Sequence, residues 1–135
     1  MFSKAVASEI KNVFTEALTL YESLYGENSV DLVDLLIDLG NAENKVKRTG
    51  MNDPVKSSSY KRALGILSSN YGDDSLEYAQ AQLAISMEVL EGSHTNNAHV
   101  FSNKYAKGAY KIISRKLGPT SVGATLASFQ LGKNQ

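Results

Sequence analysis

The residues best suited to binding chemistry are three aspartates, Asp31, Asp34 and Asp38, spaced three and four residues apart. On a helix this spacing places all three carboxylates on one face. Asp31 lies in the first turn of the expected helix, where the helix dipole favours a negative charge. Asp34 and Asp38 repel each other, so the pair fits either an ordinary solvated face or an anchor for Lys or Arg on a partner. A metal site fits less well, because no residue near the pair supplies a third strong ligand.

Two other groups of side chains have simpler interpretations. A basic stripe follows one later stretch of the chain, at Lys104, Lys107, Lys111 and Arg115. Cations near the C-terminal end of a helix interact favourably with its dipole, so a solvated face is favoured over an anionic partner or a membrane surface. His94 and His99 are five residues apart, which does not place them on one helical face, and neither adjoins a Cys or a carboxylate. We interpret the histidines as part of a connecting segment.

Composition excludes several classes of function. The 135 residues contain no cysteine, which rules out disulfides and thiolate metal sites. Fourteen basic and fourteen acidic residues cancel, and a dedicated nucleic-acid-binding protein usually has a basic excess. No apolar run approaches the ~20 residues of a membrane span. Glycines occur singly at turns, and no nucleophile elbow, phosphate loop or zinc motif is present. We therefore expect neither an enzyme nor a cofactor.

Glycine and proline divide the chain into six segments whose apolar residues have the three- and four-residue spacing of a helix face. The expected helices begin near Val6, at Asn28 or Ser29, at Asp53-Pro54, at Asp74-Ser75, near Asn96 or Asn97, and after Gly118-Pro119. The run from Asp74 to Glu77 resembles a capping box with Asp74 as its first residue. No segment of useful length has the alternation of a strand. The predicted fold class is all-α, in one domain over residues 1–135.

A repeat of 46 residues organises these helices. It relates three similar turns, Tyr25-Gly26-Glu27-Asn28-Ser29-Val30, Tyr71-Gly72-Asp73-Asp74-Ser75-Leu76 and Leu117-Gly118-Pro119-Thr120-Ser121-Val122. The same spacing relates Ala17, Ala63 and Ala109. Periods of about 20–50 residues indicate stacked supersecondary units that bury their apolar faces only against one another. Such stacks present an extended binding surface, so the repeat points to a scaffold.

The helix pairs resemble the tetratricopeptide repeat, in its longer kinesin-light-chain-type form. The most telling residues are Leu39-Gly40-Asn41-Ala42, which Leu131-Gly132-Lys133-Asn134 echoes two periods later. The resemblance places Gly40, Ser86 and Gly132 where paired helices cross closely. Departures from the family pattern are Ile10, Lys56 and Ser102, where an alanine is usual, and a connection around 48–53 that is about four residues longer than the family norm.

What the resemblance implies is a right-handed α-solenoid of about six antiparallel helices. In this family the first helix of each pair lines a concave groove. The residues that fall on that surface include Asp34, Ile37, Asp38, Asn41, Gln80, Leu83, Met87, Phe129 and Gln130. The implied groove is acidic at one end and apolar further along.

The register also predicts an incomplete last repeat. The chain starts with a second-type helix and ends inside a first-type helix, so we expect it to be part of a larger protein. The alternative is a short protein whose last helix is itself the cap. The last helix should leave Leu126, Phe129 and Leu131 uncovered. Exposed apolar stripes tend to find partners, so we expect self-association through this helix.

The function expected from the sequence is a protein–protein interaction scaffold for a segment with basic and apolar residues. The family's carboxylate clamp is not supported, because it needs Lys, Arg and Asn where this chain has Asp34, Asp38 and Gln80. One alternative is a structural spacer of a bacterial envelope protein of TonB type, or of a signalling protein. Another is a sensor of a small ligand, which a closed pocket would favour. Cytoplasm and periplasm both fit the composition.

Overall fold

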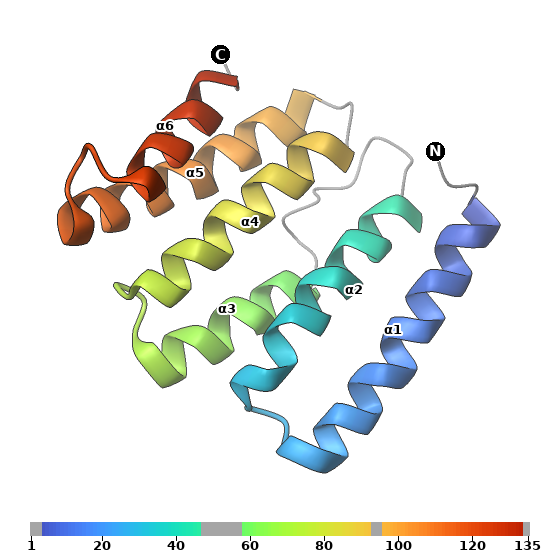
Figure 1. The fold of residues 1–135 in the computed structure, drawn as a ribbon. Coiled ribbons are helices and arrows are strands. Elements are labelled where there is room, and N and C mark those ends of the chain that lie inside the picture. Colours follow the sequence, from blue (N-terminus) through green and yellow to red (C-terminus); the bar gives the residue numbers. More distant parts are fainter. Residues whose placement is uncertain (1–3, 47–57, 93–95, 134–135) are drawn as a thin grey trace.

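The computed structural model describes residues 4–46, 58–92 and 96–133, and this part of the chain is almost entirely helical. The elements are α1 (Lys4–Tyr25), the 3₁₀ turn η1 (Val30–Leu32), α2 (Val33–Val46), α3 (Ser58–Tyr71), α4 (Leu76–Gly92), α5 (Asn96–Leu117) and α6 (Val122–Lys133). The described residues form six α-helices and include no strand. Figure 1 shows how the helices follow one another along the chain. The all-α prediction is confirmed. The expected start of the third helix at Asp53-Pro54, the long connection around 48–53, Lys56 and His94 lie outside the described residues.

The three repeated turns share one backbone geometry. Their glycines have positive φ angles, at Gly26 (93°), Gly72 (92°) and Gly118 (94°). Each glycine N–H donates to the carbonyl four residues earlier, over 2.8–2.9 Å, which satisfies an otherwise unpaired carbonyl at the helix end. A side chain at such a φ is strained, so the glycine of each turn is required by the backbone.

A serine three residues after each glycine caps the next helical element. The hydroxyl oxygens of Ser29, Ser75 and Ser121 accept hydrogen bonds from the backbone N–H of Asp31, Tyr78 and Ala124, at 3.1, 3.2 and 3.2 Å. This geometry satisfies an N–H that has no partner within the helix. The cap of α4 is therefore Ser75, and the prediction of a capping box starting at Asp74 is wrong by one residue.

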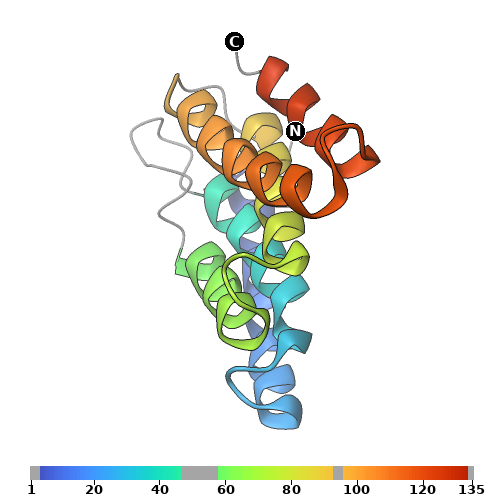
Figure 2. The same cartoon turned by 90° about the vertical axis from the view of Figure 1, so that its left-hand side faces the viewer.

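Consecutive helices pack against one another, and the even-numbered helices also contact each other. Besides the neighbouring pairs, α2 contacts α4 and α4 contacts α6. Figures 1 and 2 show α2, α4 and α6 side by side, with α3 and α5 behind them in the view of Figure 1. The helices α2, α4 and α6, which share a position in the 46-residue repeat, therefore lie next to each other in space.

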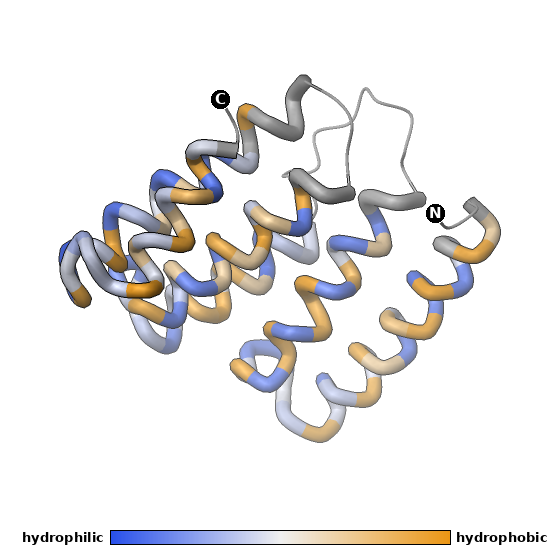
Figure 3. The backbone as a smooth tube through the Cα atoms, turned by 45° about the horizontal axis from the view of Figure 1, so that its top comes forward, coloured by the Kyte–Doolittle hydropathy of each residue, from blue (hydrophilic) through white to orange (hydrophobic). Residues whose placement is uncertain are grey.

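The core has two parts that meet at α4. Apolar residues recur along every helix in Figure 3. One cluster joins α1, α2 and α3 to Ala81, Ile85 and Val89 of α4. The second joins Ala79 and Leu83 of α4 to α5 and α6. Because α4 has helices on two sides, it is apolar on two faces and lacks the single apolar stripe of a surface helix.

Gly40, which the tetratricopeptide resemblance places at a close helix crossing, is buried on α2. We expect Gly40→Leu to destabilise the fold by about 1–3 kcal/mol, because four added carbons must be forced into packed surroundings. Urea unfolding would measure the change. Gly65→Leu is the matched control: Gly65 is exposed on α3, and a β-carbon there would meet nothing within 4 Å. Equal stability of the two variants would contradict a tight crossing at Gly40.

Candidate functional site

The predicted acidic pair is exposed on α2. Asp34 and Asp38 both present their side chains to solvent, and neither forms an ion pair with a described side chain. Partial burial, and then the neighbouring Asp34 carboxylate, raise the pKa of Asp38 above its ordinary value. Asp31 has a different role, because its carboxylate accepts a hydrogen bond from the Ser29 hydroxyl at 3.0 Å. The pair available to a partner is therefore Asp34 and Asp38.

The remaining residues of the predicted groove separate into surface and interior. Gln80 and Met87 are exposed on α4, and Ile37 is half-buried on α2. Asn41 is half-buried too, and its Oδ1 accepts a hydrogen bond from the Tyr60 hydroxyl. These positions leave side-chain atoms of both helices within reach of a partner.

Two members of the predicted groove lie in the interior. Leu83 is buried in the core cluster with Ala109 and Ile112 of α5. Gln130 is buried on α6, with its Nε2 3.4 Å from Ser102 Oγ. Phe129 is exposed on α6, at the repeat position that the buried Leu83 occupies on α4. Partner contact would therefore fall mainly on the other predicted residues.

The exposed residues of α2 and α4 share one surface. Asp34 and Gln80 are one 46-residue period apart, as are Asn41 and Met87. Equivalent positions on two helices in contact lie on corresponding sides, so these residues lie on one side of the α2–α4 pair. We call it the α2–α4 face and define it by Asp34, Asp38, Asn41, Gln80 and Met87. It combines two carboxylates with two amides and an exposed thioether.

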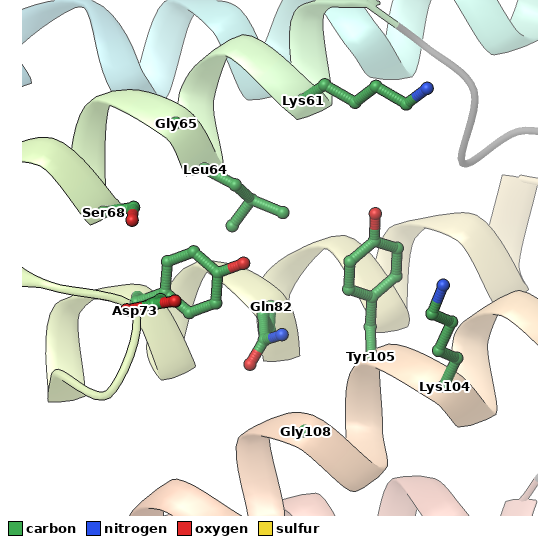
Figure 4. Close-up of a pocket in the computed structure, with 10 residues that line it drawn as sticks. Lys61, Leu64, Gly65, Ser68, Asp73, Gln82, Lys104, Tyr105 and Gly108 are labelled. Carbon is green, nitrogen blue, oxygen red and sulfur yellow. The ribbon is translucent and has the colours of Figure 1, made fainter.

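A cleft that sequence reasoning missed lies between α3, α4 and α5. Its volume is about 600 Å³, and Figure 4 shows Leu64, Gln82 and Tyr105 facing into it. The lining residues are Lys61, Leu64, Gly65, Ser68, Asp73, Tyr78, Gln82, Lys104, Tyr105 and Gly108. Lys61, Gly65, Asp73 and Lys104 are exposed, so the cleft opens to solvent. Its rim carries cations and one carboxylate, and its wall is partly aromatic.

A glycine inside α5 explains part of the cleft's shape. A β-carbon at Gly108 would lie 2.9 Å from Gln82 Nε2, so the glycine gives the glutamine amide its space. The Gln82 Oε1 is buried and has no hydrogen-bond partner among the described residues. It is thus an unsatisfied acceptor enclosed in the wall of the cleft. Gly108 lies inside α5, which corrects the expectation that the glycines lie at turns. A glycine within a helical pattern commonly has a packing reason, but it does not name the neighbour.

The basic stripe and the metal-ligating side chains form no further candidate site among the described residues. The basic stripe on α5 is exposed, and its Arg115 forms an ion pair with Asp74 of the turn before α4. No group of three or more metal-ligating side chains gathers within the described ranges. In the same part of the chain, no helix combines the length and apolar character needed to cross a bilayer.

No protein-family model matches the sequence, and a search of curated proteins finds no match. The tetratricopeptide resemblance is therefore a hypothesis from its motif residues, and the functional argument depends on the geometry of the α2–α4 face and the cleft.

Proposed function

We propose that the chain is a helical-repeat scaffold of tetratricopeptide type, a right-handed solenoid that binds a partner segment on the α2–α4 face. The observation that carries the proposal is the exposure of equivalent positions on two helices in contact, with two aspartates that no described cation neutralises. Stacked repeats commonly use such surfaces for extended partners.

The partner should carry basic residues beside apolar ones. Asp34 and Asp38 attract a Lys or Arg, and an incoming cation would offset the partial burial and the Asp34 charge that raise the pKa of Asp38. Exposed ion pairs contribute only about 0–1 kcal/mol, so charge alone gives weak binding. Met87 supplies an exposed, flexible apolar side chain that adapts to a partner's shape.

Among the alternatives, a small-ligand sensor would need an enclosed pocket. The cleft between α3 and α5 is open along Lys61, Asp73 and Lys104, which favours an extended polar segment over an enclosed small molecule. The hypothesis of a structural spacer names no binding residues, so no substitution in this chain tests it. We therefore keep the scaffold as the proposed function.

The double substitution Asp34→Asn and Asp38→Asn should weaken binding of a basic partner severalfold and flatten its salt dependence. A fluorescein-labelled peptide of alternating Leu and Lys is the probe, and a Leu–Glu peptide is the charge-reversed probe. Fluorescence anisotropy at increasing NaCl measures both quantities. Salt screens exposed charge pairs, so the unsubstituted protein should lose affinity as NaCl rises.

The matched control is Glu9→Gln with Glu16→Gln, which removes the same charge from exposed positions on α1. If both double variants weaken binding equally, the attraction comes from net charge and not from the α2–α4 face.

The dependence of binding affinity on pH is a second test of the acidic pair. Because the pKa of Asp38 is raised, its charge is lost at a higher pH than that of an ordinary aspartate, and part of the affinity should be lost with it as pH falls.

A further inference from the structure

Helix α1 presents an apolar stripe to solvent. Val13, Leu20 and Leu24 are spaced seven and four residues apart, so they lie on one helix face, and each is more than half exposed. Val6 continues the stripe one step earlier. The internal repeat identifies the kind of element that would cover this face.

The positions of α3 and α5 that are equivalent to Val13 and Leu20 are buried, whereas Asn70 and Lys116, which are equivalent to Leu24, are exposed. Leu20 is 62% exposed, whereas Ile66 and Ile112, one and two periods later, are 4% and 7% exposed. Val13 is likewise exposed, whereas Ser59 and Tyr105 are buried. Helices α2 and α4 pack against α3 and α5. The stripe on α1 is therefore shaped for a helix of the α2, α4 and α6 class.

Helix α6 has the complementary feature. Phe129 is 64% exposed, whereas Leu83, one period earlier on α4, is 9% exposed and packs with Ala109 and Ile112 of α5. Val122 and Leu126 are exposed too, but Leu126 takes the repeat position of Gln80, so it lies on the side of the α2–α4 face. The prediction of exposed apolar side chains on α6 is confirmed for Leu126 and Phe129, whereas it is wrong for Leu131, which is half-buried. The exposed face of α6 is thus shaped for a helix of the α1, α3 and α5 class.

We propose that α6 of one copy packs against α1 of a second copy and repeats the contact between α4 and α5. The side chains fit this pairing, because α1 has Ala17 and Leu20 where α5 has Ala109 and Ile112. Phe129 would take the place of Leu83 against them. The two surfaces differ, so the contact is heterologous and copies join head to tail into chains. This assembly uses the ends of the helix stack and does not depend on the α2–α4 face.

Two single substitutions test the proposal. Leu20→Asp places a charge on the α1 stripe, and Phe129→Asp places one on α6; both positions are exposed, so the fold should persist and circular dichroism would verify it. In sedimentation velocity, the unsubstituted protein should form dimers and longer chains as concentration rises. Each variant alone should remain monomeric.

Mixing the variants gives the decisive result. The Leu20→Asp protein keeps an intact α6 and the Phe129→Asp protein keeps an intact α1, so an equimolar mixture has one productive pairing and should stop at a two-chain complex. Thr19→Asp, at an exposed α1 position away from the stripe, should assemble like the unsubstituted protein. The proposal is overturned if the unsubstituted protein is monomeric throughout. It is equally overturned if either single variant still assembles, or if the mixture stays monomeric.

Discussion

Tyr60→Ala should lower the free energy of unfolding by about 3–5 kcal/mol, the range for removing a large buried aromatic side chain. Tyr60 has no exposed surface and belongs to the cluster that joins α2, α3 and α4. Small domains are stable by only about 5–15 kcal/mol, so this loss is a large part of the total. Chemical denaturation followed by far-ultraviolet circular dichroism would measure it.

Tyr60→Phe is the control that separates packing from hydrogen bonding. It keeps the ring in place but removes the hydroxyl that donates to Asn41 Oδ1 on α2. A hydrogen bond of this kind contributes about 0.5–1.5 kcal/mol, so the Phe variant should lose far less than the Ala variant. Similar losses in the two variants would mean that the ring contributes little and that the α2–α3 contact depends on the hydroxyl.

Ser86→Leu should destabilise the contact between α4 and α5 more than any other single serine change. Ser86 and Ser102 have no exposed surface, and the Ser86 hydroxyl lies 2.7 Å from Ser102 O and 2.8 Å from Ser102 Oγ. The Ser102 hydroxyl donates in turn to Ser86 O at 2.9 Å. A leucine there forces the helices apart, which costs about 1–3 kcal/mol for overpacking. Groups of Ser102 that lose their partners add about 1–3 kcal/mol.

The double variant Ser86→Ala with Ser102→Ala keeps the close approach and removes both hydroxyls. Replacing both members of a buried polar pair by apolar groups is often nearly neutral, so this variant should be much more stable than Ser86→Leu. Thermal unfolding of both variants compares them directly. If Ser86→Leu unfolds at the temperature of the double alanine variant, the crossing has room for a large side chain and the proposed register is wrong.

Local structure was the part that residue types and spacing could predict. The glycine–serine turns follow from chemistry within six residues: a glycine adopts a positive φ, and the serine after it caps the next helix. Helical periodicity likewise identifies six helices without reference to distant contacts. Residue type alone does not choose between Asp74 and Ser75 as the cap of α4, because Asp and Ser are both good caps.

The candidate site was predicted only in part. Asp34, Asp38, Gln80 and Met87 are exposed as a binding surface requires, whereas Leu83 and Gln130 are buried. Periodicity assigns a residue to a helix face, but it does not say how many neighbours that helix has. The cleft escaped detection for a similar reason, since its lining comes from three helices whose separation no local pattern encodes.

Leu20 and Ile112 illustrate where local information ends. They occupy equivalent positions of the repeat and have similar side chains, so any argument from residue type treats them alike. Tertiary packing separates them: α5 has α4 on one side and α6 on another, and Ile112 is buried, whereas the corresponding face of α1 leaves Leu20 in solvent. Burial depends on which helices surround a residue, and that is decided only when the whole stack is assembled.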